Sequence, residues 1–206
     1  MVASKVVSKA EGRIVRLADV APGEEAQRIA AQGKDPRLVQ LVLDEAAEVL
    51  RAERGVLIVE THHGFVCANA GIDLSNLPGD DTALLLPKDP DASARDLRAA
   101  LPNRPAVVIT DSFGRAWRMG QLDIALGAAG LLTVDDWRGR SDAHGRELRA
   151  TVAAVGDAVA AMADLARSKD ASEPVVLVRG LERFVTREDG PGAAALRRPR
   201  GDDLFR

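Results

Sequence analysis

The spacing of apolar residues along the chain predicts several amphipathic helices. From Asp35, apolar residues recur every three or four positions behind a capping aspartate and a first-turn proline, which predicts a helix that ends near Gly55. A second helix is expected over Ser93–Leu101, with Asp91 or Ser93 as its cap. The same spacing over Arg146–Ser168 predicts a third, long helix.

Short apolar runs rich in β-branched residues predict strands between these helices. Val56–Glu60 and Ala106–Thr110 are the clearest of them, and Pro174–Val178 is a further one. The opening run Val2–Val7 is expected to be the end of a strand, and Ser8–Gly12 to turn away from it. The chain is therefore expected to combine strands and helices from its first residues onward.

The remaining segments are expected to connect these elements. Thr61–Asn76 mixes glycine, asparagine, histidine and aspartate, which predicts a strand, a loop and a strand end. Pro78–Pro90 has the composition of a loop, and Asp135–Gly145 that of a charged loop. Asp123–Val134 is rich in glycine and alanine and fits a strand or a tightly packed helix equally well.

The order of these elements favours an α+β fold, in which helices pack on mixed sheets, over a clean β–α–β alternation. The chain has 206 residues, of which 46% are hydrophobic, which is enough for a substantial core. It contains no internal repeat, coiled coil or linker-like segment. We therefore expect a single domain over residues 1–206.

The charge balance gives no global field that would attract nucleic acid or a membrane. The chain has 31 acidic and 28 basic residues and a formal net charge of -3, so any anion site must be local. The single cysteine, Cys67, cannot form an internal disulfide, and the first residues lack the apolar stretch of a secretory signal. Ile124–Val134, a long uncharged and mostly apolar stretch, is too short to span a bilayer. These features predict a cytoplasmic protein.

Three oxygen-bearing side chains are candidates for metal binding. Asp73 and the pair Asp111 and Ser112 each follow a strand-like run, so a sheet could bring them to one edge. Two carboxylates and a hydroxyl suit Mg²⁺ or Mn²⁺ that holds phosphate oxygens. Both aspartates could equally be turn caps. Asn76, shortly after Asp73, could contact a nucleotide or close an Asx-turn.

A second candidate is a basic cluster near the start of the chain. Two hydroxyls and two ammonium groups lie within six residues, followed by the guanidinium of Arg13: Ser4, Lys5, Ser8 and Lys9. Such a cluster can hold phosphates through charge-assisted hydrogen bonds. It could also be a solvated basic edge, and it lacks the glycine-rich string of a Walker A loop.

Two further groups of side chains have competing interpretations. Four arginines lie near the two tryptophans and could clamp carboxylates or phosphates, or pair with neighbouring acids on the surface: Arg115, Arg118, Arg138 and Arg140. His62 and His63 form a separate group, because they precede Cys67 and suggest a metal or thiol site. No CxxC motif accompanies them, further soft ligands are missing, and a buried cysteine is commonly inert.

Four ordered strings carry a resemblance to a known family: KVVSKAEGR at 5–13, ETHHGFVCANAGIDLSN at 60–76, TDSFGRAWRMGQLDIALGAAGL at 110–131 and PVVLVRGL at 174–181. Together they resemble the coenzyme F420-0:L-glutamate ligase family, and the match extends to the closing DDLFR. The resemblance implies a GTP-dependent amide ligase that adds L-glutamate to coenzyme F420-0 and extends a γ-linked glutamate tail. It also implies the α+β fold of that family, an intertwined homodimer, two divalent ions (Mg²⁺ or Mn²⁺) and K⁺.

The resemblance also assigns roles to individual residues. Asp73 and Asp111 look like ligands of one divalent ion, and Ser112 like a ligand of the second. Ser4, Lys9 and Asn76 look like GTP contacts, and Lys9, Asp73 and Asp111 are the residues expected to be catalytic through an acyl phosphate. Arg115, Arg118 and Arg138 are hypothetical anchors for substrate phosphate or glutamate carboxylates. The number of glutamates, the preferred metal and the amine base are not predicted.

The chain departs from the family pattern in two places. Family members usually carry a further N-terminal segment with a GTP-contacting loop, so we expect an N-terminally short domain. Ser168 and Lys169 occupy the region where the family supplies nucleotide contacts and a second-metal ligand, and protonated lysine cannot bind a cation. No room is left for a C-terminal nitroreductase domain. The alternative function is therefore a truncated, catalytically impaired homologue that binds nucleotide or deazaflavin.

Overall fold

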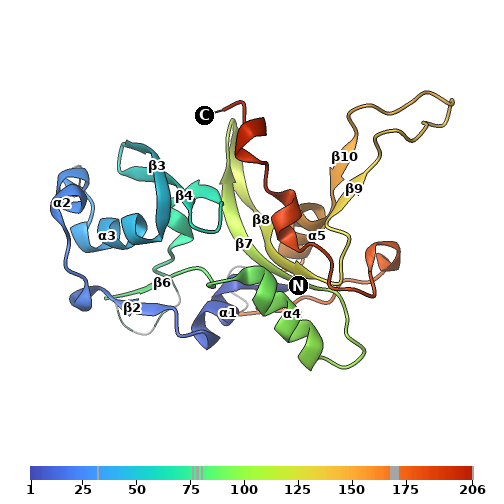
Figure 1. Cartoon of the computed structure of the whole chain (residues 1–206). Coiled ribbons are helices and arrows are strands. Elements are labelled where there is room, and N and C mark those ends of the chain that lie inside the picture. Colours follow the sequence, from blue (N-terminus) through green and yellow to red (C-terminus); the bar gives the residue numbers. More distant parts are fainter. Residues whose placement is uncertain (32, 76, 78, 80, 168–171, 206) are drawn as a thin grey trace. The chain divides into compact units, whose positions relative to one another are not determined.

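The computed structural model of the chain contains two groups of elements, each with its own hydrophobic core (Figure 1). The structure describes residues 1–31, 33–75, 77, 79, 81–167 and 172–205. The N-terminal unit consists of Ser4–Lys88 and Phe113–Gln121. The C-terminal unit consists of Met1–Ala3, Asp89–Ser112 and Leu122–Arg206. Each unit is described by itself.

The described part of the N-terminal unit combines helices with short strands and includes the ends of β7 (Val107–Arg115) and β8 (Arg118–Ala129) that face each other across their turn. The helices are α1 (Ser4–Ala10), α2 (Glu24–Ala30) and α3 (Pro36–Glu45). The strands are β2 (Ile14–Arg16), β3 (Ala46–Glu53), β4 (Val56–Thr61), β5 (Val66–Ala68) and β6 (Thr82–Leu84). Strands β3, β4 and β5 form an antiparallel sheet, and β2 pairs antiparallel with β6. Figure 1 shows α2 and α3 beside this sheet, and Val39, Val42, Leu57 and Val59 fill the core between them.

Helix α3 begins as its sequence predicts but ends earlier. Asp35 caps it by accepting a hydrogen bond from the backbone N–H of Arg37, and Pro36 occupies the first turn. The prediction that the helix continues to Gly55 is wrong, because the chain passes directly into β3 at Ala46. In β3 half-buried and exposed residues alternate, and the strand pairs along its length with β4. Cross-strand pairing therefore overrides the helical spacing of the apolar residues here.

The C-terminal unit is built on a sheet with the strand order β1-β7-β8. β1 (Val2–Ala3) runs parallel to β7 (Val107–Arg115), and a short turn joins β7 to β8 (Arg118–Ala129). The other elements are α4 (Pro90–Ala100), β9 (Val134–Asp136), β10 (Val152–Ala154) and α5 (Val155–Leu165). Short 3₁₀ turns follow in the last part of the chain. The mixture of helices with parallel and antiparallel strands agrees with the predicted α+β class.

The long helix predicted over Arg146–Ser168 is shorter than expected. Residues 152–154 form β10, antiparallel to β9, and the ribbon continues outward through a hydrogen bond from the N–H of Trp137 to the carbonyl of Thr151. Figure 1 shows this ribbon extending from the body of the unit. Only from Val155 onward do the apolar positions pack inward, with Val159, Ala160 and Ala163 buried. The helical spacing thus predicts α5 but not the ribbon before it.

The start of the chain and the segment near residue 175 also differ from the prediction. The strand at the start is confined to Val2–Ala3, and Ser4–Ala10 is helical, because the chain leaves the sheet after Ala3. Pro174–Val178 is not a strand. It makes one antiparallel bridge, between Val175 and Val2, and receives a hydrogen bond from the N–H of Ala3 at the carbonyl of Pro174 (2.8 Å).

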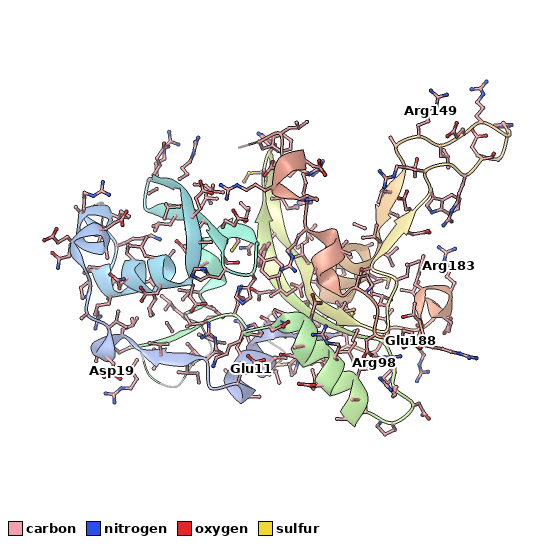
Figure 2. All side chains as sticks on the ribbon, in the orientation of Figure 1. Glu11, Asp19, Arg98, Arg149, Arg183 and Glu188 are labelled. Atoms are coloured by element: carbon pink, nitrogen blue, oxygen red, sulfur yellow. The ribbon has the colours of Figure 1, made fainter. Side chains whose placement is uncertain are left out.

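Helix α4 holds the segment that follows residue 185 through two charged side chains. Arg98 is buried and donates hydrogen bonds to the carbonyls of Thr186 (3.0 Å) and Arg187 (2.9 Å), and it pairs with Asp189. Figure 2 shows Arg98 on α4 near Glu188. The predicted cap of this helix, Asp91 or Ser93, is wrong, because Asp89 accepts the hydrogen bond from the N–H of Ala92 (2.9 Å).

Asp91 is available for other contacts because it does not cap the helix. Its Oδ1 accepts from the N–H of Ala128 on β8 (2.8 Å) and from the N–H of Ala193 (2.7 Å). Its Oδ2 accepts from the N–H of Ala194 (3.1 Å). Helix α4 thus joins the sheet to the last part of the chain. Among the described residues, no helix is long and apolar enough to cross a membrane.

Candidate active site

Asp73 follows a turn with an uncommon backbone conformation. Asn69, Ala70 and Gly71 have φ angles of 51°, 54° and 69°, so three consecutive residues are left-handed. This conformation is costly for a residue with a Cβ atom, and the buried Ala70 adopts it within the core. The Asn69 side chain stabilises the turn, since its Oδ1 accepts from Nζ of Lys34 (2.6 Å).

The backbone of Asp73 is fixed directly after this turn. Its N–H donates to the carbonyl of Leu84 (3.0 Å), and its carbonyl accepts from the N–H of Leu84 (2.9 Å). This reciprocal pair ties Asp73 to the end of β6. The position of the carboxylate is therefore set by the sheet as well as by the turn.

The side chain of Asp73 forms a small polar cluster with Lys5 and Ser75. Lys5 forms an ion pair with Asp73 and donates a hydrogen bond to Oγ of Ser75 (2.9 Å). The carboxylate also accepts from the N–H (2.9 Å) and the Oγ (3.2 Å) of Ser75. Partial burial alone would raise the pKa of Asp73, but the hydrogen bonds from Lys5 and Ser75 outweigh it and lower the pKa. The carboxylate is thus ionised at neutral pH, as a cation ligand must be.

Helix α1 separates the hydroxyls of the basic cluster from its ammonium groups. Ser4 and Ser8, one turn apart, are buried, whereas Lys9 is exposed and Lys5 reaches Asp73. Arg13 lies beyond the helix, where it pairs with Glu45 (2.7 Å) and donates to the carbonyl of Leu86 (2.9 Å). The predicted cluster is therefore divided, and Arg13 is engaged in contacts within the N-terminal unit.

Asp111 and Ser112 lie within strand β7 and not after its end, which corrects the prediction from the sequence. Because they are consecutive residues of an extended strand, their side chains point to opposite faces of the sheet. Thr110 and Ser112 share a face. Asp111 and Ser112 therefore lie on opposite faces of the sheet, and the separate ions expected for them stay a prediction.

Ser112 belongs to a buried polar network in the C-terminal unit. Its Oγ donates to Oδ1 of Asp123 (2.7 Å), and Oγ1 of Thr110 donates to Oδ2 of the same carboxylate (2.7 Å). Arg167 forms an ion pair with Asp123, whose exposed fraction is only 2%. The sequence reasoning missed Asp123 and Arg167. The available signal was that Asp123 is the only charged residue in the apolar run Leu122–Ala129 of β8.

The predicted site residues are distributed over both units. Ser4, Lys9 and Asp73 belong to the N-terminal unit, and Asp111 and Ser112 to the C-terminal unit. A joint role of Asp73 and Asp111 therefore stays a prediction. Asn76, expected to contact GTP, and the positions 168 and 169, where the family pattern departs, lie outside the described residues.

The chemistry of these donors fits a hard divalent cation. Asp73 and Asp111 offer carboxylate oxygens, and Ser112, whose hydroxyl donates a hydrogen bond to Asp123, offers a neutral oxygen. Within the part of the chain that the structure describes, no three His, Cys, Asp or Glu side chains gather into a ready-made metal centre.

Two of the candidate arginines are engaged with neighbouring acids. Arg138 forms a bidentate pair with Asp136, and its hydrogen bonds lower the pKa of Asp136 to about 2. Arg140 pairs with Asp135 (3.3 Å) and lies over the ring of Trp137. These contacts match the interpretation as surface ion pairs.

Another candidate, Arg115, donates to the carbonyl of Met119 across the β7–β8 turn (2.7 Å). This contact stabilises the turn of the hairpin. Arg118 is exposed at the start of β8, where the structure leaves its hypothetical role as an anchor a prediction.

The histidines contact backbone carbonyls. Nε2 of His62 lies 3.2 Å from the carbonyl of Asp44, and Nε2 of His63 lies 2.9 Å from that of Pro87. The ring of His63 also stacks on Phe65, with 5.8 Å between the ring centroids. Cys67 is buried in β5. These contacts hold loops against the N-terminal unit.

Comparison with known proteins places this α+β chain among ligases. The model of the family described as F420-0:Gamma-glutamyl ligase matches residues 1–180. The chain therefore belongs to the F420-0:gamma-glutamyl ligase family, as the sequence strings predicted.

Curated relatives extend the similarity to the whole chain. The coenzyme F420:L-glutamate ligase of Methanothermobacter thermautotrophicus is 44% identical over 100% of this chain and 83% of its own length. The protein of the same name from Methanopyrus kandleri is 42% identical over 100% of this chain and 84% of its own length. That from Halobacterium salinarum is 48% identical over 88% of this chain and 74% of its own length.

Proposed function

We propose that the chain is a GTP-dependent ligase of coenzyme F420 biosynthesis that joins L-glutamate to coenzyme F420-0 and extends a γ-linked glutamate tail. The observation that carries this proposal is the similarity to coenzyme F420:L-glutamate ligases, which covers all of this chain. The family match over residues 1–180 includes every residue proposed for the site. The ionised carboxylate of Asp73 beside the lysine-bearing helix α1 supports it chemically.

The reaction requires activation of a carboxylate, which is a poor acyl donor. In the proposed sequence the substrate carboxylate attacks the γ-phosphorus of GTP, which releases GDP and gives an acyl phosphate. The amine of glutamate, after loss of a proton, then attacks the acyl carbon, and inorganic phosphate leaves. Positive charge near the γ-phosphate and oxygen ligands for cations are the two features that such a site needs.

The proposed division of labour follows from the chemistry of the side chains. Ser4, Lys9 and Asn76 contact GTP, and Lys9 supports the phosphate oxygens. Asp73, Asp111 and Ser112 supply oxygen ligands to the divalent cations, which we propose to be Mg²⁺ or Mn²⁺, with K⁺ as a monovalent helper. When bound, these cations offset the negative charge on the phosphoryl group in transfer. Lys9, Asp73 and Asp111 are the proposed catalytic residues.

We also propose a homodimer that works in the cytoplasm. The proposed substrates are small, charged molecules of the cell interior. The single cysteine is compatible with a reducing compartment. Analytical ultracentrifugation of the purified chain tests the dimer.

Mass spectrometry of a complete reaction tests the proposed function. The purified chain is incubated with coenzyme F420-0, L-glutamate, GTP and Mn²⁺ with K⁺, and matched reactions each omit one component. We expect product masses that increase by whole glutamyl units, and GDP formed in equal number. Binding of F420-0 or GTP without any glutamyl product would instead support the impaired homologue, and absence of both would overturn the proposal.

A further inference from the structure

The hydroxyl of Ser112 is oriented by a buried acceptor, the carboxylate of Asp123. Ser112 Oγ lies 2.7 Å from Oδ1 of Asp123, and at this distance the carboxylate oxygen accepts a hydrogen bond from the hydroxyl. With its proton committed to Asp123, the hydroxyl directs its lone pairs away from that carboxylate. A serine oxygen that is to bind a cation needs this orientation.

The carboxylate of Asp123 is itself held from a second direction. Arg167 forms an ion pair with Asp123, and its side chain is only 10% exposed. The guanidinium balances the charge of the buried carboxylate, which would otherwise be costly to desolvate. Thr110 occupies one more acceptor position of the same group (2.7 Å). Asp123 therefore has little freedom to rotate away from Ser112.

We propose that Asp123, held by Arg167, is a positioning residue that sets the Ser112 hydroxyl for cation binding. The inference rests on the proposed function, because that function makes Ser112 a cation ligand. Asp123 acts through Ser112 and touches neither cation nor substrate. Residues that hydrogen-bond to a metal ligand and orient it commonly lower the affinity for the metal about 10- to 100-fold when they are removed.

Thr110 provides a matched control within the same network. Its hydroxyl donates to the other oxygen of Asp123 at the same distance as Ser112, and it lies on the same face of β7. Thr110 is fully buried, whereas Ser112 is partly exposed, so Ser112 is the more accessible of the two hydroxyls. Thr110→Val removes this hydrogen bond to Asp123, and a longer one that the hydroxyl accepts from Arg167 (3.4 Å), with almost no change of shape.

The test is a titration of the full chain with Mn²⁺ in the presence of a non-hydrolysable GTP analogue. Free Mn²⁺ is measured by electron paramagnetic resonance, so the readout does not depend on turnover. We expect Ser112→Ala to weaken or abolish one class of Mn²⁺ site. Asp123→Asn should weaken the same class about 10- to 100-fold. Thr110→Val should lower Mn²⁺ affinity much less than Asp123→Asn does, because Arg167 still holds the carboxylate of Asp123, although it lowers the melting temperature.

A double variant separates positioning from a general structural effect. If Asp123 acts through Ser112, adding Asp123→Asn to Ser112→Ala causes no further loss of Mn²⁺ affinity. A full additional loss, or wild-type affinity in Asp123→Asn, would overturn the inference. Wild-type binding by Ser112→Ala would instead overturn the cation role in the proposed function.

A second variant keeps the test decisive if Asp123→Asn fails to fold. Asp123→Asn combined with Arg167→Gln removes both charges of the buried pair and leaves polar side chains of similar size. We expect this variant to fold and to show the same loss of Mn²⁺ affinity. Wild-type affinity in the folded variant would overturn the inference.

Discussion

The two regions proposed to bind cations hold their ligands in opposite ways. Asp73 in the N-terminal unit is partly exposed and is held by the ammonium group of Lys5, which is itself a cation. Ser112 in the C-terminal unit is held by the buried carboxylate of Asp123, which accepts a hydrogen bond from the Ser112 hydroxyl. An incoming metal ion must compete with Lys5 at the first place. At the second, it meets an oxygen already oriented for it.

The difference shows that an oxygen ligand can be held in place either by a partly exposed ion pair or by a buried hydrogen-bond acceptor. An exposed ion pair such as Lys5–Asp73 contributes about 0–1 kcal/mol and exchanges readily. A buried pair such as Asp123–Arg167 costs several kcal/mol to break on one side only. We therefore expect the first region to respond to its ligands by local rearrangement and the second to stay fixed.

The largest effect on activity is expected from Asp111→Asn. This change removes the charge of a proposed cation ligand with almost no change of shape, so glutamate ligation should be abolished. The free energy of unfolding should change little, because Asp111 is only half-buried. Steady-state ligation assays and urea unfolding measure the two effects. Wild-type turnover in a folded Asp111→Asn would contradict the role of Asp111.

The largest effect on stability is expected from Asp123→Ala. The change removes the buried carboxylate that pairs with Arg167 and leaves its guanidinium only the longer contacts with Asp164 (3.9 Å) and Thr110 (3.4 Å), which lowers the free energy of unfolding by about 3–5 kcal/mol. Urea unfolding measures the loss. Asp73→Ala in the other region is the matched control and should cost about 1 kcal/mol or less, since its ion pair is partly exposed. Equal losses would show that the two regions are held alike.

A smaller effect in the opposite direction is expected from Lys5→Met. Without the ammonium group, Mn²⁺ no longer competes for Asp73, so affinity for Mn²⁺ in the absence of nucleotide should increase by about fivefold or less, as the strength of an exposed pair implies. Lys88→Met, which removes the same charge at an exposed position of the N-terminal unit, is the control. Weaker Mn²⁺ binding by Lys5→Met would show that Lys5 assists the site.

The smallest effects concern pH, and they should differ in sign between the two units. The pKa of Asp73 is lowered, so its carboxylate adds stability above the unfolded pKa of about 3.9, and this stability is lost as pH falls through the folded pKa. The pKa of Asp157 is raised because burial outweighs the hydrogen bond from the N–H of Ala125. Its ionisation therefore removes stability as pH rises from the unfolded to the folded pKa.

Two neutral variants test these signs. Asp73→Asn should lose stability relative to wild type at pH 7, and the difference should shrink in acid. Asp157→Asn should gain stability at pH 7 and lose that gain in acid. Thermal unfolding between pH 3 and pH 7 measures both differences. A shift of the same sign in both variants would contradict the assigned causes.

The sequence predicted the fold correctly where the spacing of apolar residues fits a helix or a strand but not both. Val56–Glu60 can pair only as a strand, and the apolar positions of α5 fit only a helix. At Ala46, Val49 and Leu50 the apolar residues fit both a helix and a strand, and pairing with β4 decides between them. Long-range pairing is not encoded in local spacing, which is also why the ribbon before α5 was predicted as helix.

In the candidate site, too, some residues could be predicted from the sequence and others could not. Asp73, Asp111 and Ser112 carry a recognisable motif, so the sequence identifies them as candidates. Asp123 and Arg167 have no motif of their own. They meet because β8 lies beside β7 and because α5 ends near the sheet, and neither fact follows from sequence spacing.

Helix α4 makes the last part of the chain difficult to remove. The family match ends at residue 180, yet the backbone of residues 186–194 supplies the partners of Arg98 and Asp91. Gly192 approaches Asp91 so closely that an added Cβ would lie 2.4 Å from the carboxylate. A chain shortened at residue 180 would therefore keep the guanidinium of Arg98 and the carboxylate of Asp91. It would lose the carbonyls and the carboxylate that contact Arg98, and two of the three N–H groups that donate to Asp91. A protein that ends at residue 180, where the family match ends, should therefore be less stable than the full chain.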